Sequence, residues 1–116
     1  MSLLAIDMGS SCCKAVVHAL DGRVLGEACH SYTPTIPALA WAELPADTFW
    51  QAFCHVTRIL SGTVTNDPIE AVGISSHGET FVPVDRHNQP LSAAILNMDN
   101  RAVAQAERLK KILDPK

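Results

Sequence analysis

Short apolar runs separated by polar turns make up the first part of the chain. The runs at residues 3–6, 14–20 and 23–32 have the length of β-strands, and Asp21-Gly22 stands between the second and the third. An Asp-Gly pair between two such runs is a strong signal for a tight hairpin. Residues 3–32 therefore predict three antiparallel strands connected as a meander.

A helical period replaces this pattern after an extended, proline-containing connection. Pro45 and Asp47 suit the first turn of a helix, and Ser61-Gly62 suits its end. Apolar residues recur between them at spacings of four, three and four, at Phe49, Phe53, Val56 and Leu60. This spacing predicts an amphipathic helix whose apolar stripe faces the core.

Residues that favour strands return after this helix. Residues 69–75 predict a buried strand, and residues 80–84 and 91–98 predict two shorter extended segments on either side of a polar turn at 85–90. A final helix is predicted from Asp99-Asn100. Its apolar face would consist of Val103, Ala106, Leu109 and Leu113.

The order of these elements predicts an α/β fold with a ribonuclease-H-like mixed sheet, built from an antiparallel meander, a crossover helix and a parallel strand. A right-handed crossover would place residues 69–75 beside the first strand. The ends of these two strands would then bring Asp7 and the loop at residues 75–79 toward one cleft. With 116 residues the chain is at most one domain, and we expect its sheet to be incomplete without further chain.

Composition excludes several classes of function. The formal net charge of −3 argues against nucleic acid or an anionic membrane as partner, because both recruit clustered Lys and Arg. No apolar run has the length of a membrane span, and no secretory signal precedes the first strand. The four cysteines show no metal or disulfide spacing, so we expect reduced thiols and a cytoplasmic protein; they are Cys12, Cys13, Cys29 and Cys54.

The turn after the first strand is the strongest candidate for chemistry. It carries Asp7, Gly9, Ser10 and Ser11, with Lys14 at the start of the next strand. Such a turn presents backbone N–H groups and hydroxyls to one point, as a phosphate requires, and the carboxylate of Asp7 can hold Mg²⁺. The alternative is an ordinary hairpin in which the aspartate and the serines only cap the turn.

Two later blocks carry polar groups near the predicted cleft. His77, Gly78 and Glu79 follow the predicted strand at 69–75, where a carboxylate could accept protons from the hydroxyls of a polyol; a solvated loop is the alternative. Asp99 could cap the last helix, with Arg101 exposed, or both could face the cleft. A metal site at His77 and Glu79 would lack a third ligand. No Ser/His/Asp triad, Walker motif or protein-kinase signature is present.

With these blocks in place, the chain resembles the N-terminal part of the FGGY family of carbohydrate kinases, within the actin/hexokinase/Hsp70 ATPase superfamily. The resemblance extends over nearly the whole chain in order and spacing. It rests on Ala-Ile-Asp-Met-Gly-Ser-Ser at 5–11 with Lys14, Asp21-Gly22, Trp-Ala-Glu at 41–43, the helix start at 45–50, Ala-Val-Gly-Ile-Ser at 71–75, Val84-Asp85 and Asn-Met-Asp-Asn-Arg-Ala at 97–102.

The resemblance implies an ATP- and Mg²⁺-dependent kinase that transfers the γ-phosphoryl group to a hydroxyl of a sugar or polyol. Asp7 would then lie near Mg²⁺, and Gly9, Ser10, Ser11 and Lys14 would bind the ATP phosphates. The substrate would be faced by His77, Gly78 and Glu79, with Asp99 and Arg101 close by.

This sequence also departs from the family. Glycerol kinases tend to have Arg-Glu at Gly78-Glu79, xylulose kinases tend to have Met-His there, and many members have Trp at Asn97. The family's catalytic aspartate lies well downstream, and its adenosine pocket belongs to a second domain. We therefore expect residues 1–116 to be the N-terminal part of the first kinase domain, inactive alone, with the remainder of the kinase as partner and self-association through the open sheet edge. The alternative is a stand-alone module that binds phosphate or protein without catalysis.

Overall fold

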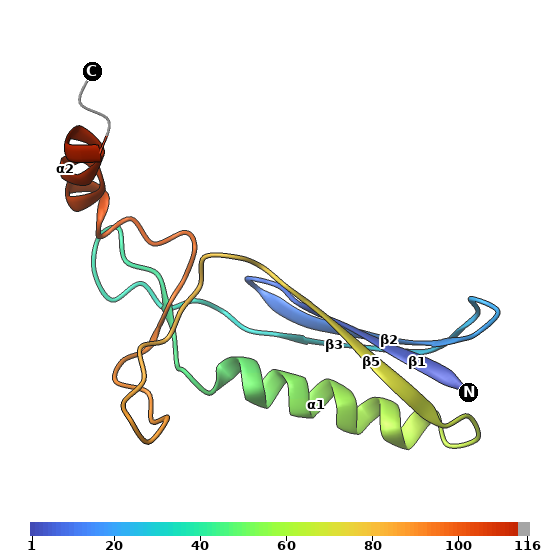
Figure 1. Cartoon of the computed structure of the whole chain (residues 1–116). Helices are drawn as coiled ribbons and strands as arrows, with labels where there is room; N and C mark the ends of the chain where they lie inside the picture. Colours follow the sequence, from blue (N-terminus) through green and yellow to red (C-terminus); the bar gives the residue numbers. More distant parts are fainter. Residues whose placement is uncertain (114–116) are drawn as a thin grey trace.

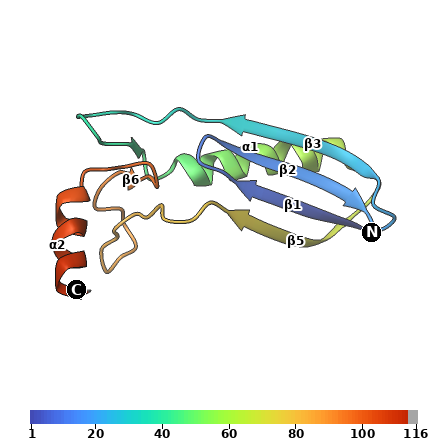
Figure 2. The same cartoon turned by 90° about the horizontal axis from the view of Figure 1, so that it is seen from above.

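A four-stranded mixed sheet forms the body of the molecule. The computed structural model describes residues 1–113, so the predicted chain end at Asp114-Pro115-Lys116 lies outside the described residues. The strands are β1 (Ser2–Met8), β2 (Cys12–Ala19), β3 (Val24–Ser31) and β5 (Ile69–Ser76), in spatial order β3-β2-β1-β5. β1, β2 and β3 pair antiparallel, whereas β5 runs parallel to β1 (Figure 2). The predicted meander and returning parallel strand are confirmed.

Helix α1 (Thr48–Thr63) connects the meander to β5 and covers one face of the sheet (Figure 1). Alternate residues of β1 and β2 point toward it, because successive side chains of a strand point to opposite faces. The resulting core contains Leu4, Ile6, Cys13, Ala15 and Val17 from the strands and Ala52, Val56 and Leu60 from the helix.

The bounds of α1 differ slightly from the prediction. Helical residues begin at Thr48, and Asp47 takes the N-cap position without a side-chain capping bond. Gly62 lies within the last turn because the Val64 N–H still donates to the Leu60 carbonyl. The predicted apolar stripe is present, with Val56 buried and Phe49 packed against the core while partly exposed.

The prediction that residues 69–75 form a buried strand is right about the strand and wrong about its burial. β5 is an edge strand, and Val72 and Ile74 are 52% and 62% exposed. Helix α1 packs on β2 and β3. Val72 and Ile74 lie opposite Leu4 and Ile6, so they share the face that carries α1 but lie beyond the helix, whereas the exposed Leu3 lies on the opposite face. Exposed apolar side chains of β1 and β5 are therefore present on both faces of this edge of the sheet.

A smaller region follows at the end of the sheet where β1 finishes. It contains a two-stranded sheet of β4 (Glu43–Leu44) and β6 (Ala94–Ile95), and then α2 (Val103–Leu113), which projects away from the body (Figure 1). The buried residues Ala42, Leu44, Ala94 and Leu96 join this region to the main core. No described helix has the length and apolarity that a membrane crossing requires.

Three expectations for this region need correction. Residues 80–84 form no strand: Phe81 and Val84 make single backbone bridges, and Pro83 cannot donate to a ladder. Of residues 91–98 only Ala94–Ile95 is a strand. The last helix begins at Val103 instead of Asp99, and in the described structure none of its residues is buried.

Candidate functional site

Three polar residues form a row across the end of the sheet. In the strand register Asp7 of β1 lies opposite Lys14 of β2 on one side and Ser75 of β5 on the other. Directly opposed residues in adjacent strands point to the same face, with Cβ atoms about 4.5–5.5 Å apart in antiparallel pairs. Asp7 and Lys14 therefore share the open face of the sheet, beside the turn that carries Gly9, Ser10 and Ser11.

The glycine turn is closed by hydrogen bonds of its own backbone and of Tyr32. The Gly9 N–H donates to the Cys12 carbonyl at 2.9 Å, and the Tyr32 N–H donates to the Ser11 carbonyl at 2.9 Å. The Tyr32 hydroxyl donates to the Gly9 carbonyl. A Cβ at position 9 would lie 3.1 Å from the Cys12 carbonyl oxygen, so a side chain there would require the turn to shift by a few tenths of an ångström.

Burial sets the ionisation of the groups around this turn. Burial raises the pKa of Tyr32 to about 12, with smaller contributions from the neighbouring thiols and Asp7. Burial also raises the pKa of the Cys12 and Cys13 thiols. These side chains stay neutral near pH 7 and add no negative charge that would repel a phosphate. All four cysteines are free, as the sequence predicted.

An open hollow of about 520 Å³ lies over this row, lined by residues that include Asp7, Lys14 and Ser75. Within the described residues, the Asp7 carboxylate takes part in no ion pair shorter than 4 Å. Mg²⁺ in phosphate sites usually takes one or two carboxylates, with water and phosphate oxygens as its other ligands. One accessible carboxylate beside two serines therefore fits such an ion.

His77 lies directly after β5 and contacts the end of β1. Its N–H and its Nδ1 both lie within hydrogen-bond distance of the Met8 carbonyl, at 3.0 and 2.8 Å. Its Nε2 lies 2.6 Å from the Thr80 hydroxyl oxygen. The ring packs against Phe49, with centroids 5.7 Å apart, at the rim of a pocket of about 160 Å³. Both ring nitrogens thus have partners within the protein.

The two residues after His77 are exposed. A Cβ at Gly78 would meet nothing within 4 Å, so this position leaves open space. Glu79 has a φ of +66°, a left-handed conformation that is uncommon for a residue other than glycine. Strained backbone of this kind occurs preferentially at ligand sites. Glu79 is exposed, so its side chain is accessible beside the open position at Gly78.

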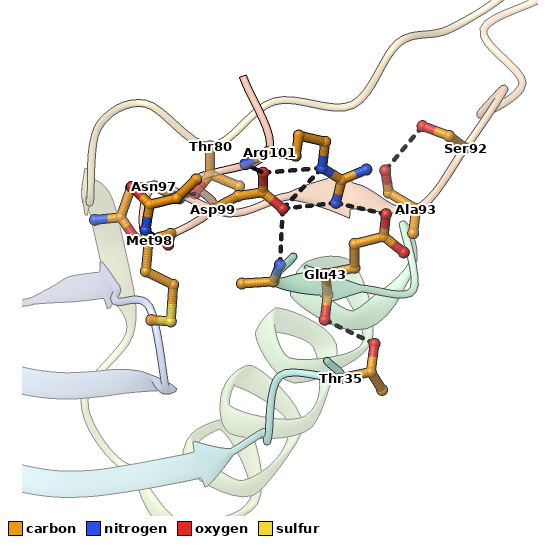
Figure 3. Close-up of polar contacts among 11 residues, drawn as sticks. Thr35, Glu43, Thr80, Ser92, Ala93, Asn97, Met98, Asp99 and Arg101 are labelled. Carbon is orange, nitrogen blue, oxygen red and sulfur yellow. Dashed lines mark hydrogen bonds and ion pairs between the residues drawn. The ribbon is translucent and has the colours of Figure 1, made fainter. Parts of the chain in front are cut away.

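Asp99 and Arg101 form an ion pair that holds residues 41–43 (Figure 3). The Asp99 carboxylate accepts from the Ala42 N–H at 2.7 Å and from the Arg101 side chain. Arg101 also donates to Glu43 at 2.7 Å, and its guanidinium lies 3.8 Å from the centre of the Trp41 ring. The Asp99 side chain is only 3% exposed, so its negative charge is neutralised by Arg101 within this network.

The network also explains the ionisation of its members. The hydrogen bond from Arg101 holds the pKa of the Asp99 carboxyl well below its usual range, assisted by the Ala42 N–H. In turn, the hydrogen bond to Asp99 raises the pKa of Arg101. Both groups are charged throughout the neutral range, and Asp99 does not cap α2, which starts four residues later.

Several residues of this region were missed by sequence reasoning. Tyr32 and Thr80 contact the predicted residues, but nothing in their local sequence marks them. Glu43 belongs to a block that carries the family resemblance, yet its partner Arg101 is 58 residues away. Only strand register and tertiary packing bring such pairs together.

A sheet of order β3-β2-β1-β5, with a crossover helix and a glycine turn after a central strand, has the ribonuclease-H-like α/β fold. The model of the FGGY family of carbohydrate kinases, N-terminal domain, matches residues 2–116. The chain belongs to this family.

Individual relatives agree with this assignment. The chain is 33% identical over 108 residues to the L-xylulose/3-keto-L-gulonate kinase of Escherichia coli K12. The matched region covers 90% of this chain and 22% of that protein. It is 31% identical over 111 residues to a glycerol kinase of Janthinobacterium sp. strain Marseille, covering 93% of this chain and 22% of the relative. The chain thus spans about a fifth of the length of the curated relatives it matches.

Solved structures show the same fold. A xylulose kinase from Rhodospirillum rubrum superposes with a TM-score of 0.92 at 20% identity, over 98% of this chain and 24% of that one. A Plasmodium falciparum glycerol kinase with ADP superposes with a TM-score of 0.80 at 20% identity, over 99% of this chain and 23% of that one. The predicted ribonuclease-H-like fold is confirmed.

Proposed function

We propose that this chain is the phosphate-binding part of an ATP-dependent kinase that transfers the γ-phosphoryl group to a hydroxyl of a sugar or polyol. The observation that carries the proposal is the placement of Asp7 between Lys14 and Ser75, directly beside the closed glycine turn. Phosphoryl transfer depends mainly on positioning and on neutralising charge. This end of the sheet offers one carboxylate, one ammonium and a set of hydroxyls for both tasks.

The nucleotide side consists of residues 7–14. Ser10, Ser11 and Lys14 bind phosphate oxygens, and the fixed backbone at Gly9 lets a phosphate approach closely. Asp7 would hold Mg²⁺, which would supply positive charge to neutralise the phosphate oxygens. Lys14 adds a cationic point charge in the same hollow.

The substrate side lies around residues 77–79. The exposed Glu79 carboxylate accepts a hydrogen bond from a substrate hydroxyl, and the space at Gly78 receives part of the substrate. His77 lies at this side but contacts protein through both ring nitrogens. Asp99 and Arg101 shape the site by holding residues 41–43, since their charges satisfy each other.

Phosphoryl transfer also needs a base that accepts the hydroxyl proton and a closed cleft that excludes water. We assign neither to residues 1–116, so the remainder of a kinase is the natural partner of this chain. Its packing would cover the exposed apolar side chains of β1 and β5. Half of a cleft offers a few exposed hydrogen bonds of about 1 kcal/mol each. The chain alone should bind Mg-ATP with a dissociation constant on the order of millimolar or weaker and should not turn over a sugar.

The test is an NMR titration of the ¹⁵N-labelled chain with Mg-ATP, followed by glycerol and a panel of pentoses and hexoses. We expect amide shifts at residues 9–14 with Mg-ATP and at residues 77–79 with a polyol or sugar. Asp7→Asn should remove the dependence of the first set on Mg²⁺. Asp21→Asn is the matched control, because Asp21 is an exposed carboxylate in the β2–β3 hairpin.

The outcomes separate the alternatives. Shifts with Mg-ATP but with none of the sugars or polyols would favour a phosphate-binding module without catalysis. An absence of shifts at residues 9–14 would refute the phosphate site. Measurable turnover by the purified chain would contradict the assignment of the catalytic base to another part of the kinase.

A further inference from the structure

One side chain joins three segments that are far apart in sequence. His77 contacts the Met8 carbonyl at the end of β1 through Nδ1, at 2.8 Å, and the Thr80 hydroxyl through Nε2, at 2.6 Å. The same Thr80 oxygen accepts from the Asn97 N–H at 3.3 Å. The imidazole and one hydroxyl thus connect the phosphate turn, the loop after β5 and the start of the 97–101 segment.

Only one tautomer of the neutral imidazole satisfies all the donors and acceptors in this cluster. A carbonyl oxygen can only accept, so Nδ1 must carry the proton that is donated to Met8. Nε2 then has a lone pair and accepts from the Thr80 hydroxyl. The Thr80 oxygen can still accept from the Asn97 N–H, so the bonding capacity of each group is used without conflict.

The contact with Met8 acts on the glycine turn itself. The Met8 carbonyl and the Gly9 N–H belong to the same planar peptide group. That N–H donates to the Cys12 carbonyl at 2.9 Å and closes the turn. Hydrogen bonds in series polarise one another, so the bond from His77 strengthens the bond that shapes the phosphate site. The series runs from Asn97 through Thr80, His77 and Met8-Gly9 to Cys12.

We propose that His77 is a positioning residue: held as its Nδ1–H tautomer, it fixes the glycine turn relative to the Glu79 loop and the segment beginning at Asn97. This inference rests on the proposed function, because the contacts of His77 set the distance between the proposed phosphate site and the proposed sugar site. Its geometry, however, concerns only residues of this chain. His77 therefore serves the substrate through the backbone that it holds, and its ring nitrogens do not contact the substrate.

The first measurement is the tautomer of His77 by two-dimensional ¹⁵N NMR of its ring nitrogens in the 116-residue chain. We expect the proton on Nδ1 in the folded chain and the ordinary mixture of tautomers for the same ring after unfolding in urea. A folded-state ring with its proton on Nε2, or one that averages as it does in urea, would overturn the proposal. Neither result depends on nucleotide, so this test can fail or succeed independently of the kinase assignment.

The second measurement uses variants of the hydroxyl and the ring. Thr80→Val should release the Asn97 amide, whose hydrogen exchange should accelerate roughly two- to tenfold, the factor set by the net free energy of one hydrogen bond. The same variant should also allow the His77 ring to populate both neutral tautomers. Thr80→Ser should restore both properties, and Thr65→Val, in the exposed loop after α1, should change neither.

The ring variants distinguish positioning from a general effect on folding. Asn places a side-chain N–H near the position of Nδ1, so His77→Asn should keep the Gly9 amide resonance close to that of the wild type. His77→Leu should shift it while leaving the amide resonances of α1 unchanged. If Leu and Asn shift the Gly9 amide equally, or if Leu leaves it in place, His77 does not position the turn.

Discussion

The guanidinium of Arg101 donates to both carboxylate oxygens of Asp99, through Nε at 2.8 Å to Oδ1 and through Nη2 at 2.6 Å to Oδ2. Paired contacts of this kind are the strongest form of ion pair in proteins. The same carboxylate accepts from the Ala42 N–H, and the same guanidinium reaches Glu43. The pair therefore fastens the segment before β4 to the segment after β6.

Replacing Asp99 by Asn should lower the free energy of unfolding at neutral pH, because Arg101 would lose its carboxylate while it stays charged. The pKa of Asp99 is lowered in the folded chain, so its contribution is fully present above the unfolded pKa of about 4. The contribution declines as the pH falls through the lower folded pKa. Urea unfolding followed by circular dichroism from pH 7 to pH 2 measures this difference.

The wild type and Asp99→Asn should therefore converge in stability toward the acid end of the series. Asp21→Asn is the control, since Asp21 forms an exposed pair with Arg23 at 3.6 Å and exposed pairs contribute little. A constant difference between the wild type and Asp99→Asn down to pH 2 would show that the folded-state pKa of Asp99 is not lowered.

Replacing Tyr32 by Phe should destabilise the glycine turn. The buried hydroxyl donates to the Gly9 carbonyl, and its removal should lower the free energy of unfolding by about 0.5–1.5 kcal/mol. The folded pKa of Tyr32 is raised to about 12. A raised pKa means that the stabilisation is present below the unfolded pKa of about 10 and is lost as the pH rises from there through the folded value.

The chain has a single tyrosine, so the absorbance of tyrosinate reports Tyr32 directly. We expect its titration midpoint near pH 12 in the folded chain and near pH 10 in urea. The stability difference between the wild type and Tyr32→Phe should shrink between these two values. A midpoint of about 10 in the folded chain would mean that the hydroxyl is not buried against the turn.

Gly26 of β3 lies beneath α1, where a Cβ would be 3.2 Å from Leu60 Cδ2 and 3.2 Å from Val64 Cγ2. Gly26→Ala should therefore overpack this contact and destabilise by about 1–3 kcal/mol. Leu60 is 1% exposed, so Leu60→Ala should cost about 2–5 kcal/mol. The double variant should cost less than the sum of the two, because the smaller side chain makes room for the new methyl group.

Urea unfolding of the four chains in this cycle measures the coupling free energy between the two positions. Gly62→Ala serves as the control, because a Cβ there meets nothing within 4 Å. If the effects of Gly26→Ala and Leu60→Ala are additive, the close approach of the helix to β3 is not what requires glycine at position 26.

Much of this fold could be predicted from local sequence. The Asp21-Gly22 pair predicted the hairpin correctly, because Gly22 adopts the positive φ of +87° that the turn requires. The apolar spacing of α1 and the parallel return of β5 also followed from period and chirality. Each of these features depends on residues that are close in the sequence or on a general rule of connection.

The failures have a common physical cause. The apolar run at 69–75 is the same whether its strand lies between neighbours or at an edge, since burial depends on which other segments flank it. Residues 80–84 and 91–98 have the composition of strands, but their pairing is confined to single bridges and to Ala94–Ile95. The contacts of His77 were equally hidden, because tertiary structure determines which groups its ring nitrogens meet.

The edge strand β5 predicts the behaviour of the chain in solution. Its outer backbone groups and its exposed Val72 and Ile74 can pair with another chain, so we expect the apparent mass to rise with concentration in light scattering. Ile74→Lys should reduce this rise, because a charged side chain on an edge opposes pairing and an exposed position tolerates it. Leu39→Lys is the matched control, since Leu39 is 96% exposed and lies outside the sheet. If both variants associate like the wild type, the contact uses another surface, of which the exposed apolar side chains of α2 are the next candidate.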